Sequence, residues 1–179
     1  PSKQLLVLNT TDGTELGRCS LEKRPIKMCA GNIANFGSST LFCSDKTGHV
    51  RAFCLPSLKN SVSLGGHATS IVTGVDISPC ENFLVSSDRD EKIKVSCLPQ
   101  TLSIQAYCLG HTGPIIDLCF IKLHPRRKEY CMISIGGDGM IGIWDYSTGN
   151  LLAKIDAEDK RIPLQCTSSS NVQLMAKIS

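Results

Sequence analysis

The fold is decided by residues 110–145, which read GHTGPIIDLCFIKLHPRRKEYCMISIGGDGMIGIWD. The stretch opens with a Gly-His pair, continues through an apolar segment to a Ser and an Asp, and closes on an alternating run that ends in Trp-Asp. The same order of residue types occurs once before, without the Trp: Gly66-His67, Ser86, Asp90 and Ile93-Lys94-Val95. A unit of about 45 residues is therefore repeated.

A repeat of this length that begins with Gly-His and ends with Trp-Asp resembles the blade of a WD-repeat β-propeller. The position of Trp144 is held in earlier repeats by Ser96, Phe53 and Leu8, and each is followed by a turn cluster. Short alternating runs between turns predict an all-β chain. The predicted repeats are 10–54, 55–97 and 98–146, with a partial repeat at 147–179.

The length of 179 residues is short for such a ring, because seven blades at this period need roughly 300 residues. Residues 3–9 read as the last strand of a blade whose beginning is absent. We therefore expect residues 1–179 to form a partial WD-repeat β-propeller, about four blades of a seven-bladed ring, cut at both ends.

The repeated His, Ser and Asp residues have two interpretations. One is a hydrolase triad, since acyl transfer uses a nucleophile, a base and an orienting carboxylate. The other is a buried structural network, which satisfies polar groups that would each cost about 1–3 kcal/mol if left unpaired. Repetition favours the structural network, so no catalytic residue is expected. Its predicted members are His67, Ser86 and Asp90 in one repeat and His111, Ser134, Asp138 and Trp144 in the next.

Residues 136–142 superficially resemble a dinucleotide-binding fingerprint, but that motif requires a helix after the glycines. An alternating strand follows here, so the glycines indicate a tight turn and no cofactor is expected.

The ten cysteines form no C-x-x-C pair, and many lie in apolar runs. This pattern favours buried reduced thiols of a cytosolic or nuclear protein over disulfides or a zinc site.

The net charge of +3 with 20% charged residues is too balanced to indicate a nucleic-acid-binding protein on electrostatics alone. No apolar run approaches the length of a membrane span, so no membrane contact is expected.

One loop, 122–129, is basic and contains a proline. Its residues Arg126, Arg127 and Lys128 either contact RNA backbone or form a solvated loop.

The turn at residues 88–92 departs from an ordinary blade turn, because all five of its residues are charged where a turn such as Asp-Gly is usual. Alternation places Lys92, Lys94 and Ser96 on one side of the following strand. One interpretation is local pairing, with Arg89 bridging Asp88 and Glu91, which contributes about 0–1 kcal/mol. The other is a surface that selects a charged partner.

Residues 88–96, DRDEKIKVS, closely resemble the signature of the WD-repeat, non-catalytic subunit of tRNA (guanine-N7-)-methyltransferases. The resemblance continues through residues 103–111 and back through 76–79 and 45–50, and covers roughly 40–146. Departures from the family lie at residues 114–116 and in the basic 125–128 loop.

This resemblance implies a seven-bladed propeller that binds a Rossmann-fold, S-adenosylmethionine-dependent catalytic subunit in a heterodimer. In that family the propeller stabilises and positions the catalytic subunit, which methylates N7 of a guanosine in the tRNA variable loop, and the propeller meets tRNA mainly through its partner. The implied partner-binding residues are Asp88, Arg89, Glu91, Lys92 and Lys94.

The implied location is nuclear, with the cytoplasm as a second site. The alternative function is a general WD-repeat adaptor, such as a ubiquitin-ligase substrate receptor or a signalling scaffold.

Overall fold

The computed structural model describes residues 3–33, 38–123 and 129–156. These residues form β-strands joined by turns, which confirms the prediction of an all-β chain. Short apolar runs alternate with turn residues throughout, and this period-2 pattern suits strands that bury one or both faces against neighbouring sheets.

The strands form one two-stranded and three four-stranded antiparallel sheets, in the order of the chain. The two-stranded sheet contains β1 (Gln4–Leu8) and β2 (Glu15–Ser20). The four-stranded sheets, here called blades, are β3–β6 (Pro25–Ile33, Ser38–Asp45, His49–Cys54, Val62–Gly66), β7–β10 (Val72–Ile77, Phe83–Asp88, Lys92–Cys97, Ile104–Leu109) and β11–β14 (Ile115–Lys122, Tyr130–Gly136, Met140–Asp145, Asn150–Asp156).

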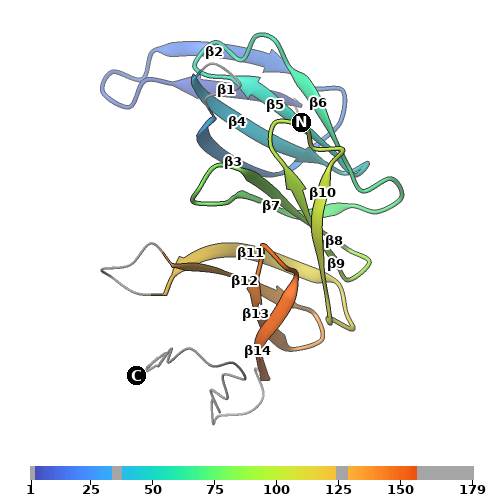
Figure 1. Cartoon of the computed structure of the whole chain (residues 1–179). Helices are drawn as coiled ribbons and strands as arrows, with labels where there is room; N and C mark the ends of the chain where they lie inside the picture. The colour runs from blue at the N-terminus through green and yellow to red at the C-terminus, as the bar shows by residue number, and fades with distance from the viewer. Residues whose placement is uncertain (1–2, 34–37, 124–128, 157–179) are drawn as a thin grey trace.

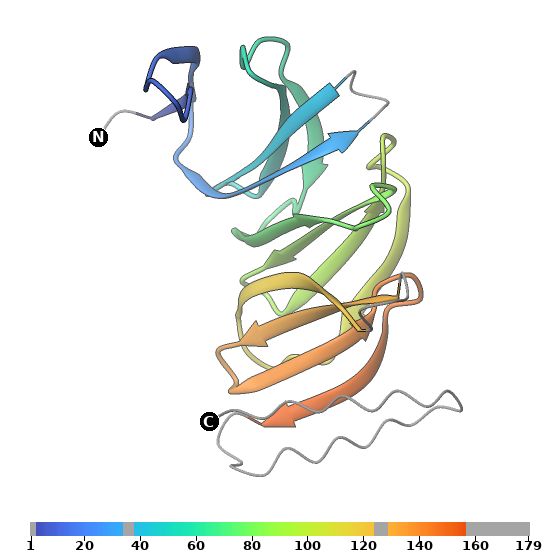
Figure 2. The same ribbon diagram turned by 90° about the vertical axis from the view of Figure 1, so that its left-hand side faces the viewer.

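The sheets lie face to face in a curved stack that follows the chain from β1 to β14 (Figures 1 and 2). Within each blade every strand pairs with the next one along the chain, so the first strand of each blade lies at one edge and the fourth at the other. The first strands β3, β7 and β11 lie side by side, because β7 contacts both of the others.

The predicted repeats are shifted by one strand from the blades. The predicted repeat 55–97 contains β6, β7, β8 and β9, and the repeat 98–146 contains β10 to β13. Each repeat thus supplies the fourth strand of the preceding blade before it builds three strands of its own. Of the partial repeat 147–179, β14 is described, and residues 157–179 lie outside the described residues.

The hydrophobic core is divided among the spaces between sheets. One cluster joins the β3–β6 and β7–β10 blades and includes Phe42, Val72 and Leu84. A second joins the β7–β10 and β11–β14 blades around Trp144. A third packs the β1–β2 sheet on the β3–β6 blade. Because neither face of an inner blade can be buried by that blade alone, stability depends on stacking between neighbours.

An ion pair also links two blades that are not adjacent. Nζ of Lys27 in β3 lies 2.5 Å from Oδ2 of Asp117 in β11, although β7 stands between these strands in the stack. Both side chains are partly exposed.

The cysteines of the described residues are free thiols, and three of them, Cys43, Cys108 and Cys131, are buried within blades. Burial raises the pKa of Cys108 to about 12, with the carboxylate of Asp145 adding to the effect. This thiol stays protonated at neutral pH and packs as a small apolar group. Residues 3–33, 38–123 and 129–156 contain no helix that could cross a membrane.

The division of the core predicts different costs for two leucines. Leu84 is buried between blades, whereas Leu102 is 90% exposed. Leu84→Ala should lower the free energy of unfolding by about 2–5 kcal/mol, because it leaves a cavity, and Leu102→Ala should change it by less than about 0.5 kcal/mol. Urea denaturation measures both. Equal losses would show that the packing between blades is not what stabilises the fold.

Candidate functional site

A continuous hydrogen-bonded chain is buried in the β11–β14 blade. The loop before β11 brings His111 to within 2.7 Å of Oγ of Ser134, measured from Nε2. The indole N–H of Trp144 donates to the same oxygen at 2.8 Å. Because a carboxylate only accepts hydrogen bonds, Nδ1 carries the N–H that bonds Asp138 at 3.1 Å, and Nε2 accepts the hydroxyl hydrogen of Ser134. The structure thus brings together the four residues that the repeat pattern associates.

The carboxylate of Asp138 also closes the turn around it. It accepts the backbone N–H groups of Thr112 at 2.7 Å and Met140 at 3.1 Å. Burial alone would raise the pKa of Asp138, but these amides and the bond from His111 outweigh it and lower the pKa to about 2.

This geometry does not suit acyl transfer. Ser134 is fully buried and Ser86 is 2% exposed. The hydroxyl of Ser134 is also held between an indole and an imidazole. A nucleophile must reach a substrate carbonyl, and neither hydroxyl reaches the surface. The buried chain satisfies polar groups, which is the structural interpretation of the repeated His, Ser and Asp.

The preceding blade contains a related network with a different acid. Nε2 of His67 lies 2.9 Å from Oγ of Ser86, and Nδ1 lies 2.7 Å from Oδ2 of Asp88. The sequence pattern assigned Asp90 to this position, and that assignment is wrong. Asp90 is exposed, whereas Asp88 is 2% exposed.

The physical reason lies in the residue two positions after each serine. In the β11–β14 blade this residue is Gly136, and a Cβ atom there would overlap Nδ1 of His111 and the carboxylate of Asp138. In the β7–β10 blade the same position is Asp88, whose side chain occupies this space directly. Its other oxygen, Oδ1, accepts the N–H groups of Asp90 and Lys92 at 2.9 Å each. Asp88 therefore binds both the histidine and the turn amides, as Asp138 does in the next blade, although it lies at a different sequence position in the repeat.

A second exchange accompanies the first. The pairing of strands shows which positions are equivalent in the two blades. Ser86 pairs with Lys94 in one blade, and Ser134 pairs with Gly142 in the other. Lys94 is therefore equivalent to Gly142, and Ser96 is equivalent to Trp144. In the β11–β14 blade the indole covers Gly142, and a Cβ there would lie 2.6 Å from Nε1 of Trp144. In the β7–β10 blade the smaller Ser96 stands in place of the indole, and Lys94 carries the longer side chain.

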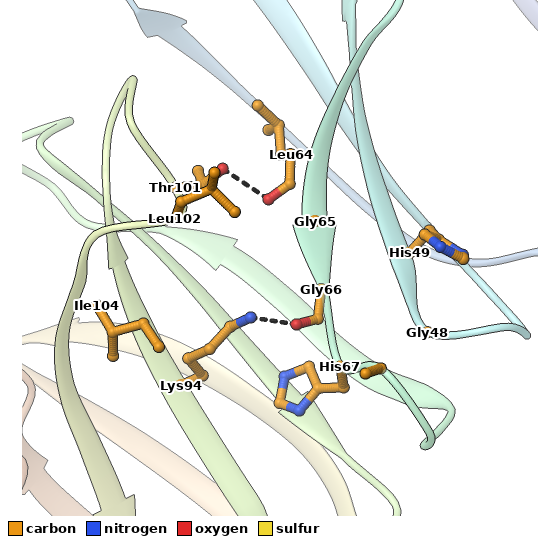
Figure 3. A pocket seen from close by; sticks show the side chains of 11 residues that line it. Gly48, His49, Leu64, Gly65, Gly66, His67, Lys94, Thr101, Leu102 and Ile104 are labelled. Carbon is orange, nitrogen blue, oxygen red and sulfur yellow. Dashed lines mark hydrogen bonds between the residues drawn. The ribbon is translucent and has the colours of Figure 1, made fainter.

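The ammonium of Lys94 donates to the carbonyl oxygen of Gly66 at the end of β6 (Figure 3). Burial lowers the pKa of Lys94, while the carboxylate of Asp88 opposes this shift. Burial also lowers the pKa of His67; Asp88 again opposes the shift, and Lys94 adds to it. Asp88 is therefore the anion that both basic groups share.

Lys94 lies in the wall of a cavity of about 290 Å³ between the β3–β6 and β7–β10 blades. The cavity is bounded by Leu64, Gly65 and Gly66 on one side and by Thr101, Leu102 and Ile104 on the other (Figure 3). Oγ1 of Thr101 donates to the carbonyl of Leu64 at 2.6 Å and joins the two walls. A Cβ atom on Gly65 would meet nothing within 4 Å, so the cavity opens beside that residue.

The other charged residues of the turn lie on the surface. Arg89, Glu91 and Lys92 are exposed, and within the part of the chain that the structure describes the guanidinium of Arg89 forms no ion pair. The local bridge from Arg89 to Asp88 is therefore absent, because Asp88 turns inward to His67. Glu91 has φ of 70°, where Gly139 stands in the next blade with φ of 74°. A non-glycine residue in this conformation costs free energy.

The predicted partner-binding set thus divides in two. Asp88 and Lys94 belong to the buried network and the cavity wall, while Arg89, Glu91 and Lys92 form an exposed rim above them. The structure adds Leu102 and Ile104, which sequence reasoning missed because an isolated apolar residue in a turn or strand carries no distinctive pattern. Arg126, Arg127 and Lys128 lie outside the described residues.

The exchange of acids predicts a difference between two neighbouring aspartates. Asp88→Asn removes the shared anion of His67 and Lys94 and should lower the free energy of unfolding by about 1–3 kcal/mol. Asp90→Asn, at an exposed position, should change it by less than about 0.5 kcal/mol. Thermal and urea unfolding of both variants test this. A larger loss in Asp90→Asn would restore the assignment made from the repeat pattern.

The pKa of Asp138 predicts a specific acid response. Because the folded pKa of about 2 lies below the ordinary value of 3.8, Asp138 stabilises the fold above pH 3.8, and this contribution is lost as the pH falls toward 2. The free energy of unfolding of Asp138→Asn should therefore depend less steeply on pH between 4 and 2 than that of the parent. Parallel curves in that range would contradict the low pKa.

Comparison with known proteins assigns the chain to a family. The family model described as the tRNA methyltransferase TRM82 WD40 domain matches residues 61–178. These residues include the β7–β10 and β11–β14 blades with both networks.

Individual relatives agree. The chain is similar to proteins named tRNA (guanine-N(7)-)-methyltransferase non-catalytic subunit wdr4 in Dictyostelium discoideum, with 34% identity over 72% of this chain and 31% of that protein, and in Danio rerio, with 31% identity over 78% and 33%. The Homo sapiens WDR4 protein of the same description is 27% identical over 84% of this chain and 35% of its own length. The chain spans about a third of the length of these relatives. It belongs to the family of TRM82 WD40 domains.

Proposed function

We propose that the protein is the non-catalytic WD-repeat subunit required for N7-methylguanosine formation in tRNA. Its proposed partner is a catalytic tRNA (guanine-N7-)-methyltransferase subunit, which it stabilises and positions in a heterodimer. The family membership supports this proposal, as do the names of the relatives. The buried serines, which suit structure better than catalysis, are consistent with a scaffold.

The observation that carries the docking site is that the loop acid found beside the counterpart of Lys94 is missing beside Lys94 itself. In the β3–β6 blade the position of Lys94 is held by Arg51, whose guanidinium lies 3.7 Å from the carboxylate of Glu22 in the loop before β3. Ser20 is the last residue of β2, and Glu22 is the second residue after it. Gly66 is the last residue of β6, and the second residue after it is Ala68. Ala68 therefore occupies the loop position that corresponds to Glu22.

Lys94 therefore faces the cavity without the loop carboxylate that its counterpart receives. Asp88 is already bonded to His67 and to two backbone amides. A half-buried ammonium beside an open cavity is suited to an anion brought by another protein, and a carboxylate is the anion that proteins supply. We expect a carboxylate of the catalytic subunit to enter the cavity at Lys94.

The exposed rim of Arg89, Glu91 and Lys92 complements this anchor. Charges at the edge of an interface mainly speed association and exclude wrong partners. Asp88 holds the turn in one shape, because its Oδ1 accepts the backbone N–H groups of Asp90 and Lys92, and a rigid docking surface limits the entropy lost on binding. A propeller that binds in this way would hold the catalytic subunit in its active geometry.

Three further parts of this proposal rest on the resemblance alone. They are a seven-bladed ring, contact with tRNA mainly through the partner, and a nuclear location with the cytoplasm as a second site. Imaging of the tagged protein in cells tests the location, and crosslinking of the assembled complex to tRNA tests the contacts.

The docking site is tested by Lys94→Met, which keeps an apolar stem of similar length and removes the charge. Binding to the catalytic subunit should weaken by about 30-fold or more, as for a buried charge pair that loses one partner. The affinity of the parent should fall with added salt, and that of Lys94→Met should fall less. Isothermal titration at two salt concentrations measures both, and methylation of tRNA by the complex should decline in parallel at limiting partner concentration.

The matched control is Lys154→Met, which removes an exposed lysine from the fourth strand of the next blade. It should bind as the parent does. If Lys94→Met is folded and binds with the parent's affinity and salt dependence, Lys94 is not the anchor. If the parent itself fails to bind the catalytic subunit, the proposed function is wrong.

A further inference from the structure

The fourth strand of the β7–β10 blade carries an exposed apolar strip. Ile104 is 44% exposed, Tyr107 45% and Leu109 62%, and Leu102 in the turn before the strand is 90% exposed. β10 is an edge strand of its sheet (Figure 1). Contiguous apolar surface of this kind on a folded protein commonly marks an interaction site.

Strand register places this strip next to the lysines of β9. Tyr107 pairs with Lys94, and Leu109 pairs with Lys92, so each pair shares one face of the sheet. Ile104 pairs with Ser96 on that face and lines the cavity beside Lys94. The alternate residue Cys108 points the other way and is buried against the next blade. The strip is therefore continuous with the proposed anchor site.

The other described sheets show that the fold does not require apolar residues here. In β14 the residues opposite Gly142 and Met140 are Lys154 and Asp156. The corresponding residues are Arg18 and Ser20 in β2, and Ser63 and Gly66 in β6. Among the four sheets that the structure describes, β10 alone has two large apolar side chains, Tyr107 and Leu109, at these positions.

We infer that Leu102, Ile104, Tyr107 and Leu109 form an apolar docking strip for the catalytic subunit, against a partner surface that presents apolar side chains beside carboxylates. The inference rests on the proposed function and extends its site from the charged turn along β10. The charge of the neighbouring Lys92 and Lys94 sets the chemistry of the partner surface. Tyrosine and aliphatic side chains that become fully desolvated supply much of the affinity in such interfaces.

The test is the double variant Tyr107→Ser, Leu109→Ser. Its affinity for the catalytic subunit should fall by about 10-fold to 100-fold, by the same factor at low and high salt, because the lost contacts are apolar. Lys94→Met should instead lose more at low salt. The matched control is Leu151→Ser, which removes an exposed leucine of β14 (39% exposed) and should bind as the parent does.

Three results would overturn the inference. The double variant could bind with the parent's affinity while Lys94→Met binds weakly, which would leave the proposed function standing without the strip. Light scattering could show that the double variant no longer self-associates while its affinity for the catalytic subunit is unchanged, which would assign the strip to a second copy of this chain. Hydrogen exchange of the parent is independent of any folding defect in the variant, and β10 amides that exchange equally fast in the free and bound protein would also reject the strip.

Discussion

The hydrogen bond between a buried serine and a histidine from the loop between blades is the interaction on which the rest of the structure depends. The loop that leaves one blade carries the histidine, and the second strand of the next blade carries the serine. Each bond therefore fixes where one sheet begins relative to the sheet before it. The apolar clusters between sheets supply most of the stabilisation, but the buried polar bonds select one arrangement of them.

Much of this arrangement could be predicted from the sequence, because the same pattern of residues occurs in successive repeats. The residues around Trp144 follow this pattern, and the structure brings them together. The assignment of Asp90 failed because spacing from the turn was the only guide available. The replacement of Gly136 by Asp88 changes which carboxylate can reach the histidine, and this depends on a Cβ position that spacing does not reveal.

The strip on β10 shows a different limit of sequence reasoning. Tyr107 and Leu109 alternate with the equally apolar Ala106 and Cys108, so the sequence does not show which face is buried. Ile104 joins the face of Tyr107 and Leu109 only through the register shift between Ile104 and Ala106. In the structure the buried face is the one that carries Cys108. Which face of an edge strand is covered depends on how far the strands of the preceding blade extend. That is a property of two repeats together, so neither repeat predicts it separately.

The ion pair between Lys27 and Asp117 reports the curvature of the propeller. Stacked sheets are spaced by about 10 Å, so strands two sheets apart in a flat stack would be roughly 20 Å apart, beyond the reach of a lysine and an aspartate. The two side chains meet at 2.5 Å because the inner edges of the sheets converge while the outer edges fan apart. This single contact thus shows that the blades are wedge-shaped. Because the blades diverge toward the rim, there is room between two of them for the cavity beside Lys94.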